Sequence, residues 1–316
     1  MELSQIDPQI IADDCPKLIL GPHLKTGGQK RVWRCAYKGK AYVLKALMVD
    51  QETRRRVKRE IQVMRACASP YLPRFGPIPL RELGLKEGSK ILYFLEEYIE
   101  GTPLDSVYKP MPYAEVARLG LCVAEALATL AMNGYLHRDV KPMNIIQKSP
   151  THFILIDAGL ALDPDGDAIT MPGKVVGTRA YLSPDQITLP QKKLDIRSDF
   201  FCLGPVLYEA ATGEHPFWNE ETPKGDIIHN ILNFECVSPV RFNAGLPTTL
   251  AAITMKLLRK NRNERYLDFK ELHDALAPLV QDGQNRSPAQ GESEASQRRN
   301  GKRTSVRGQA TSRRRI

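Results

Sequence analysis

One short polar segment constrains this 316-residue chain more than any other part of it. Residues 137–144 read His-Arg-Asp-Val-Lys-Pro-Met-Asn, and Asp157 follows thirteen positions after Asn144, directly behind an apolar run. Asp139 is a candidate base and Lys141 a candidate cation. Asn144 and Asp157 offer the oxygen ligands that a hard divalent cation such as magnesium needs. The chain therefore has to fold so that one hairpin-sized stretch gathers groups that handle a proton, an anion and a metal ion.

These residues resemble the catalytic loop and the metal-binding segment of the eukaryotic-type, or Hanks-type, serine/threonine protein kinases, and the resemblance runs from about Leu18 to about Pro278. It implies a kinase domain over 18–280 with an α+β, two-lobed, protein-kinase-like fold. A small antiparallel β lobe with one helix would cover 18–98, and a larger, mainly helical lobe 99–280. The resemblance also implies transfer of the γ-phosphoryl group of ATP, bound with Mg²⁺, to serine or threonine hydroxyls of protein substrates.

Composition agrees with a globular enzyme. A chain of 316 residues with 42% hydrophobic content can bury the core of one large domain or two subdomains. It has no run of about 18 apolar residues, and its first residues lack the form of a signal peptide, so we expect a cytoplasmic protein without a transmembrane segment. The six cysteines are far apart with no C-x-x-C pair, which argues against a zinc site or a disulfide framework.

The two ends of the chain differ from its body. Residues 1–17 precede the resemblance and are expected to form an N-terminal extension. Residues 281–316 carry nine Lys or Arg and three Asp or Glu, so they hold six of the nine net positive charges. This segment has too few apolar side chains to fold alone, and we expect a disordered basic tail. It either contacts nucleic acid, anionic lipid or an acidic partner, or is simply a solvated segment.

The apolar pattern predicts the main elements. Strands of an antiparallel sheet are expected at 32–37, 41–45 and 91–95. Helices are expected at 51–67, 113–134, 199–212, 247–259 and 268–279. Val57, Ile61 and Met64 form one apolar stripe in the first of these helices. Gly134 is typical of a helix end, and Pro205 should bend the first turns of its helix because it lacks an N–H.

The stretch before Val32 departs from the family's glycine-rich loop, Gly-x-Gly-x-x-Gly-x-Val, which lets backbone N–H groups approach the phosphates. Only Gly27 falls in place and Gly28 is extra, while Lys25 and Lys30 occupy the flanking glycine positions. These lysines could add positive charge beside the nucleotide, and Val32 would contact adenine. The alternative is that the two glycines form a hairpin turn without a role in binding.

Lys45 is the last residue of an Ala-Tyr-Val-Leu-Lys run. This position resembles that of the family's lysine, which holds the α- and β-phosphates of ATP. By resemblance its partner is Glu60, which lies beside the apolar stripe of the helix. A carboxylate there would keep the lysine charged and oriented, because an unpaired buried ammonium is costly. The alternative is a surface pair between Glu60 and Arg56, one helical turn away.

The segment Leu-Glu-Glu-Tyr-Ile that ends at Ile99 resembles the hinge of the family. Backbone groups of Glu97 and Ile99 would hydrogen-bond the adenine edge. Glu96 stands where a bulky apolar residue is usual. It either turns away from the pocket, pairs with a lysine, or shows that the alignment is shifted by one position.

In the catalytic loop, the resemblance assigns Asp139 to the proton of the substrate hydroxyl and Lys141 to the charge of the transferring phosphoryl group. Asn144 and Asp157 would ligate Mg²⁺. Ala158 replaces the usual phenylalanine of the Asp-Phe-Gly motif, so a large apolar contact to the helix that carries Glu60 is missing.

Residues 177–185 resemble the peptide-docking segment Gly-Thr-x-x-Tyr-x-Ala-Pro-Glu. The resemblance places Thr178 near the catalytic Asp and Lys as a further catalytic residue, and it pairs Asp185 with Arg265. Asp199 would accept hydrogen bonds from the backbone beneath the catalytic loop. Small-molecule kinases generally lack such a docking segment.

Thr170 is the only hydroxyl residue between Gly159 and Gly177. Because Arg138 precedes the catalytic Asp, a phosphate on Thr170, added by autophosphorylation, could dock on Arg138 and order the loop. An unmodified, flexible loop is the alternative.

Three functions therefore stay open at this level. The first is a protein serine/threonine kinase, and the second is a pseudokinase scaffold, supported by the degraded glycine loop, Ala158 and Glu96. The third is a small-molecule kinase, which the docking segment disfavours. The charges that phosphoryl transfer requires are all retained, and this favours the first function.

Overall fold

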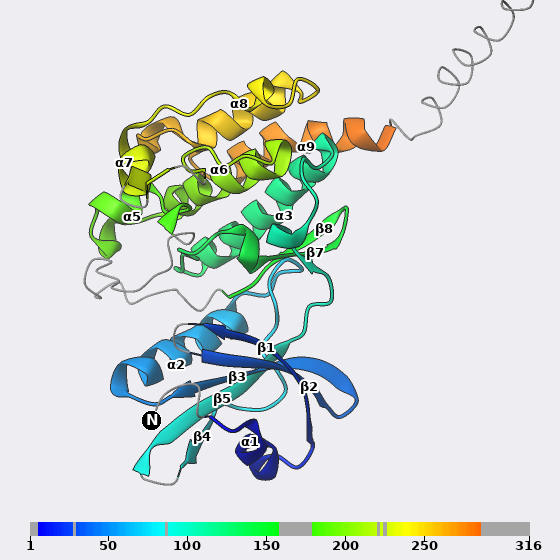
Figure 1. The fold of residues 1–316 in the computed structure, drawn as a ribbon, viewed down its shortest axis with the longest axis vertical. Helices are drawn as coiled ribbons and strands as arrows, with labels where there is room; N and C mark the ends of the chain where they lie inside the picture. Colours follow the sequence, from blue (N-terminus) through cyan, green and yellow to red (C-terminus); the bar gives the residue numbers. More distant parts are fainter. Residues whose placement is uncertain are drawn as a thin grey trace, which may run out of the picture.

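The computed structural model describes residues 6–27, 30–85, 88–157, 179–219, 222–223 and 226–285. These residues form two lobes that lie one above the other along the long axis of the molecule (Figure 1). The small lobe is built on a five-stranded sheet, and the large lobe is mainly helical. The α+β, two-lobed fold predicted from the sequence is therefore confirmed.

The sheet of the small lobe is antiparallel, in the order β1-β2-β3-β5-β4. Its strands are β1 Leu18–Gly27, β2 Lys30–Tyr37, β3 Lys40–Met48, β4 Arg81–Gly84 and β5 Lys90–Glu97. The predicted apolar runs lie in β2, β3 and β5, and β3 occupies the middle of the sheet. Lys45 of β3 pairs with Val32 of β2 on one side and with Phe94 of β5 on the other. The lysine therefore starts from the most enclosed strand.

A short helix, α1 (Pro8–Asp14), packs on the same sheet (Figure 1). Ile6 and Ile11 are buried in one cluster with Trp33 of β2 and Leu44 of β3. The described part of the predicted N-terminal extension therefore contributes to the core of the small lobe.

Helix α2 (Gln51–Ala66) begins after Asp50, whose side chain accepts a hydrogen bond of 2.6 Å from a first-turn N–H. Such an N-cap satisfies one of the backbone donors that a helix start leaves unpaired. Val57 and Ile61 are buried against β3 and β5, as the apolar stripe predicted. This orientation turns Glu60 inward, where it is only 5% exposed.

The large lobe is organised around α3, which ends before Gly134 with φ 78°, as predicted. Its helices are α3 Tyr113–Met132, α5 Pro184–Thr188, α6 Ile196–Thr212, α7 Asp226–Asn233, α8 Thr248–Leu257 and α9 Phe269–Asn285. Single 3-10 turns lie at Leu104–Ser106, Pro142–Asn144, Gln191–Lys193, Pro239–Arg241 and Arg262–Glu264. A small sheet, β6 (Thr102–Pro103), β7 (Ile145–Ser149) and β8 (His152–Leu155), lies on the side of this lobe that faces the small lobe (Figure 1).

Helix α6 begins earlier than predicted because Asp195 caps it, accepting a 3.0 Å hydrogen bond from the Arg197 N–H. The helix continues through Pro205 as one element. Its neighbour Gly204 allows close packing, since a Cβ there would lie 2.7 Å from a methyl carbon of Leu258.

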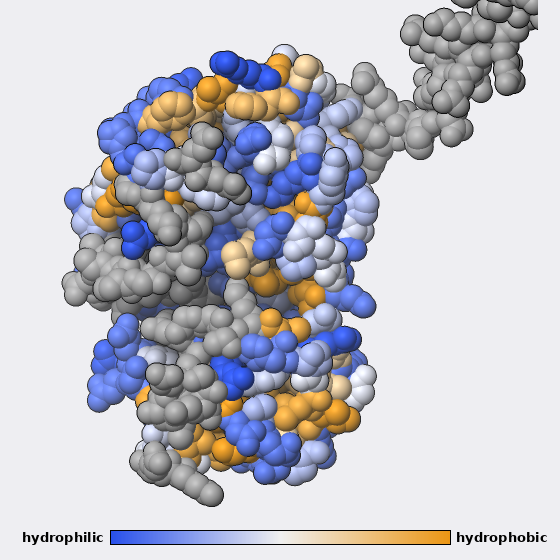
Figure 2. All heavy atoms as spheres, in the orientation of Figure 1, coloured by the Kyte–Doolittle hydropathy of each residue, from blue (hydrophilic) through white to orange (hydrophobic). Residues whose placement is uncertain are grey.

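Helix α9 continues to Asn285, so residues 281–285 form its last part and do not belong to a disordered tail, contrary to the prediction from composition. The remainder of the predicted tail, 286–316, lies outside the described residues, and so do its predicted contacts with nucleic acid or acidic partners. No described helix has the length and apolar character needed to cross a membrane. On the face in Figure 2, polar and apolar side chains are interspersed over both lobes, as on most globular surfaces.

Candidate active site

A tight β-hairpin explains the thirteen-residue spacing between Asn144 and Asp157. Asn144 closes a 3-10 turn, and β7 and β8 then run out and back, so that Asp157 returns to the start of the hairpin. The Ile156 N–H donates to the Asn144 carbonyl at 2.8 Å. Asp157 has φ 63°, in the left-handed region that residues other than glycine rarely adopt. The two predicted metal ligands are thus held at one end of the hairpin.

The predicted catalytic-loop residues form one hydrogen-bonded cluster. The Lys141 ammonium donates to Oδ2 of Asp139 at 2.7 Å. The side-chain amide of Asn144 donates to the same Oδ2 and to the Asp139 carbonyl, each at 2.9 Å. These bonds use the nitrogen of the Asn144 amide, so the amide oxygen is the atom suited to ligate a cation. The carboxylate of Asp139 is therefore oriented by a cation and by an amide.

Asp199 holds the backbone beneath this loop, as predicted. Its carboxylate accepts hydrogen bonds of 2.8 Å from the N–H groups of His137 and Arg138. Burial raises the pKa of Asp199, while these backbone donors and nearby positive charges act in the opposite direction. His137 Nε2 lies 3.1 Å from the Ile156 carbonyl and links the loop to the hairpin. Gln186 donates to the Arg138 carbonyl at 2.9 Å, a contact that the sequence analysis missed.

Three carboxylates surround the ammonium of Lys45. Its Nζ lies 2.6 Å from Glu96, 2.8 Å from Asp157 and 3.4 Å from Glu60. The lysine side chain is 3% exposed. The predicted pair with Glu60 is present, but within a larger cluster in which Glu96 is nearer. Asp157 belongs to the large lobe, so its bond to Lys45 joins the two lobes.

A second lysine completes the cluster. Lys30 Nζ lies 2.9 Å from Oδ1 of Asp157, the same oxygen that Lys45 contacts, and 3.8 Å from Glu60. Lys30 opens β2 and pairs with Gly27 across the hairpin, in the register of the predicted glycine loop. The sequence pointed to this role of Lys30, because a lysine there stands where the family has a glycine. Its side chain is 23% exposed, much more than that of Lys45.

The mixed charges decide the protonation states in this cluster. Burial alone would lower the pKa of Lys45, but the surrounding carboxylates, Asp157 foremost, hold it well above its usual value. Burial alone would raise the pKa of Asp157, and Lys30 and Lys45 hold it well below its usual range. Burial raises the pKa of Glu96, with the neighbouring carboxylates adding to the rise and Lys45 opposing it. A charged Lys45 and a charged Asp157 are therefore the stable forms.

Of the three alternatives for Glu96, the structure selects pairing with a lysine. The carboxylate is 6% exposed and points inward from the end of β5.

In the adjoining hinge, the Glu97 N–H donates to the Arg74 carbonyl at 2.9 Å. An adenine contact by Glu97 would thus have to use its carbonyl group. Ile99 follows two residues later and is half-buried.

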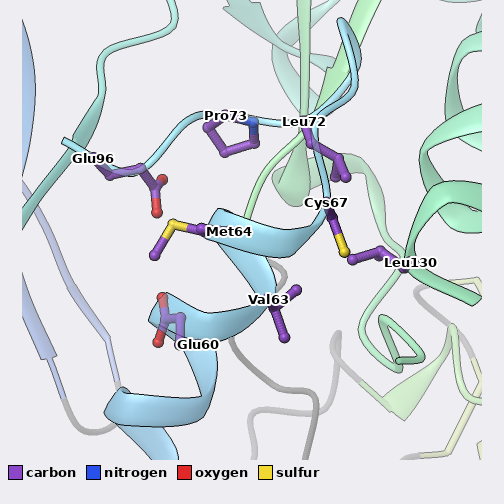
Figure 3. A pocket seen from close by; sticks show the side chains of 8 residues that line it. All are labelled: Glu60, Val63, Met64, Cys67, Leu72, Pro73, Glu96 and Leu130. Carbon is purple, nitrogen blue, oxygen red and sulfur yellow. The ribbon is translucent and has the colours of Figure 1, made fainter. Parts of the chain in front are cut away.

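A cavity of about 10 Å³ lies behind this cluster, between α2, β5 and α3. Glu60 and Glu96 line one side of it, and Cys67, Leu72 and Leu130 the other (Figure 3). In Figure 3 the side chain of Met64 lies between the two carboxylates. A space of this volume is at the lower limit for one water molecule. The carboxylates are thus shielded from bulk solvent on this side.

The predicted pair between Asp185 and Arg265 is present and buried. The guanidinium lies 2.5 Å from the carboxylate, and the Arg265 side chain is 0% exposed. Backbone carbonyls of Arg197 and Arg259 accept further hydrogen bonds from it, at 2.9 and 2.7 Å. Asp185 lies in the first turn of α5, so the pair fixes the end of the docking segment to the base of the large lobe.

Several predicted residues lie outside the described part of the chain. These are Gly28, Ala158, Thr170 and Thr178. The predicted loss of an apolar contact between Ala158 and the helix that carries Glu60 therefore stays a prediction.

The donor set fits a magnesium ion that is shared with phosphates. Asp157 offers carboxylate oxygens and Asn144 an amide oxygen, which are hard ligands of the kind Mg²⁺ prefers. Among the described residues, no group of three or more His, Cys, Asp or Glu side chains has metal-binding geometry. Mg²⁺ commonly takes one or two protein ligands and completes its shell with phosphate oxygens and water. Two ligands at one end of a hairpin match that mode.

Comparison with known proteins agrees with this geometry. The family model described as protein kinase domain matches residues 21–275, most of the chain. The chain therefore belongs to the protein kinase domain family.

Among curated relatives, a probable serine/threonine-protein kinase, CPE1738, of Clostridium perfringens is 30% identical over 236 residues, or 74% of this chain and 33% of the relative. Serine/threonine-protein kinase PknH of Mycobacterium bovis is 27% identical over 282 residues, 84% of this chain and 46% of the relative. PknB of Mycobacterium leprae is 31% identical over 227 residues, 70% of this chain and 35% of the relative. The chain thus spans less than half the length of these relatives.

Proposed function

We propose that this chain is an ATP-dependent protein serine/threonine kinase that uses Mg²⁺. One observation carries the proposal: Lys45 of the small lobe contacts Asp157 of the large lobe at 2.8 Å, while the neighbouring Asp139, Lys141 and Asn144 form a cluster of their own. Phosphoryl transfer needs these charges around one triphosphate, because catalysis of this reaction rests on positioning and on stabilising negative charge.

Each residue takes a defined part in this proposal. Lys45, held by Glu60 and Glu96, binds phosphate oxygens of the nucleotide. Asp139 accepts or orients the proton of the substrate hydroxyl, and Lys141, 2.7 Å from it, stabilises the phosphoryl group in transfer.

The proposal also assigns the groups that contact the metal and the base. Asn144 and Asp157 hold Mg²⁺, which supplies positive charge to the phosphates when bound. Val32 and the backbone of Glu97 and Ile99 hold adenine.

The pseudokinase alternative rests on the altered glycine loop and on Glu96. The geometry weakens this alternative, because Glu96 is ion-paired with Lys45 instead of blocking it. The catalytic carboxylate of Asp139 is likewise held by two donors. A scaffold without turnover would have no need to keep both clusters charged and paired.

We also propose a cytoplasmic site of action. All six cysteines are free and buried, which suits a compartment that keeps thiols reduced and supplies ATP.

Transfer of labelled phosphate tests the proposed function. Purified chain is incubated with γ-labelled ATP, Mg²⁺ and a mixture of unstructured acceptor proteins, and the labelled residues are identified by peptide mapping. We expect label on serine or threonine of the acceptors or of the chain itself, and no label with the Asp139→Asn variant. Label that appears only on small molecules, or no label at all despite ATP binding, would reject the proposal in favour of the alternatives.

A further inference from the structure

Lys30 reaches into the site from a position where the family has a glycine. It opens β2, pairs across the hairpin with Gly27, and sends its ammonium to Asp157 at 2.9 Å. The contact crosses from the small to the large lobe, as that of Lys45 does. Its side chain is therefore directed at the place where the nucleotide phosphates and the metal are expected.

The two lysines share one carboxylate oxygen but differ in their other partners. Both contact Oδ1 of Asp157, at 2.8 and 2.9 Å. Lys45 has a second close carboxylate, Glu96 at 2.6 Å, whereas the next carboxylate to Lys30 is Glu60 at 3.8 Å. If Asp157 binds a divalent cation instead of the lysines, Lys45 keeps Glu96 as a close partner, whereas Lys30 loses its nearest carboxylate.

Exposure separates the two lysines in the same way. The side chain of Lys30 is 23% exposed and that of Lys45 is 3% exposed. A lysine is a compact point charge on a flexible stem, so a partly exposed one can move to a new anion at small cost. A triphosphate is the anion that the proposed reaction brings to this place.

We propose that Lys30 is a second phosphate-binding cation of the nucleotide site, which leaves Asp157 for the β- and γ-phosphates when MgATP binds. This inference rests on the proposed function. In a glycine-rich loop, backbone N–H groups approach the phosphates closely and bind them. In this chain the ammonium of Lys30 would replace part of that binding.

A different role for Lys30 would be a latch. In that case its bond to Asp157 would only hold the two lobes together without nucleotide, and it would compete with Mg²⁺ for the carboxylate. The two roles predict opposite effects of removing the charge on the affinity for ATP, so a binding measurement separates them.

The test compares Lys30→Met with Lys40→Met by calorimetric titration with MgATP and with adenosine. Lys40 is exposed at the other end of the β2–β3 pair, so its substitution removes the same charge from the same sheet. We expect Lys30→Met to weaken ATP binding by about tenfold, or about 1.4 kcal/mol, as for one lost charge-assisted hydrogen bond. Adenosine binding should stay unchanged, which also shows that the site is folded. Lys40→Met should match the wild type, and Lys30→Arg should retain most of the affinity for ATP.

Unchanged or tighter ATP binding by Lys30→Met would overturn the inference and leave the proposed function standing. Equal loss of ATP and adenosine affinity would also overturn it, because the effect would not depend on phosphate. If the wild-type chain binds no MgATP, the proposed function fails, and the inference fails with it.

Discussion

The carboxylate of Glu96 lies 2.6 Å from the ammonium of Lys45, and both side chains are nearly inaccessible to solvent. This contact places a charge where the family usually has an apolar residue. The buried carboxylate of Glu96 is tolerated because it pairs with the ammonium of Lys45, and a paired buried charge is far less costly than an isolated one. Glu96 is therefore part of the apparatus that holds Lys45.

A double-mutant cycle on this pair tests that role. Lys45→Met alone leaves Glu96 buried without its nearest cation and should lower the free energy of unfolding by about 3 kcal/mol. Glu96→Gln added to it removes the unpaired charge and should recover about 1–2 kcal/mol. The measurement is denaturant unfolding of wild type, both single variants and the double variant at neutral pH. Simple additivity of the two single effects would show that the contact is energetically irrelevant.

The buried pair of Asp185 and Arg265 predicts a large loss of stability. Asp185→Asn leaves a fully buried guanidinium without its carboxylate, and breaking such a pair costs about 3–5 kcal/mol. Thermal unfolding of the variant should show a clearly lowered midpoint. Lys270→Met is the control, because Lys270 and Asp274 form an exposed pair, whose loss should leave the midpoint nearly unchanged. Equal midpoints for the two variants would contradict the assigned role of the buried pair.

A pH dependence follows from His215, which packs edge-on against the ring of Tyr181 and accepts a hydrogen bond from the Phe217 N–H. Burial lowers the pKa of His215 to about 4, from an ordinary value of 6.5. Between these two pKa values, His215 binds a proton in the unfolded chain but not in the folded chain. The free energy of unfolding therefore falls as the pH falls, by roughly 3 kcal/mol at most.

The variant His215→Asn keeps an acceptor for the Phe217 N–H but cannot titrate. Its free energy of unfolding, measured by denaturant at intervals from pH 7 to pH 4, should fall less steeply than that of the wild type. Parallel curves for the two proteins would show that His215 does not control this part of the pH dependence.

Much of the fold follows from local sequence signals. The apolar stripe of Val57 and Ile61 predicted α2 and its buried face, and Gly134 marked the end of α3. The ends of the elements are harder to predict, because they depend on capping. The side chain of Asp195 starts α6 earlier than the apolar pattern does.

The part of the candidate site that lies in the catalytic loop could be predicted from the sequence. Asp139, Lys141 and Asn144 come together as their spacing indicates. The ion-pair partners were harder to foresee, because they depend on which strands are neighbours. Glu96 meets Lys45 only because β5 lies beside β3, a pairing of segments about fifty residues apart in the sequence.

In the proposed function, Asp139 serves the transfer of phosphate and not the binding of nucleotide. The most direct measurement is a single-turnover experiment with γ-labelled MgATP and an acceptor protein, run beside an ATP-binding titration, for wild type and Asp139→Asn. We predict that the variant binds ATP as the wild type does and transfers phosphate at least about 10²-fold more slowly. Equal transfer rates, or loss of binding and transfer together, would show that Asp139 does not have this role.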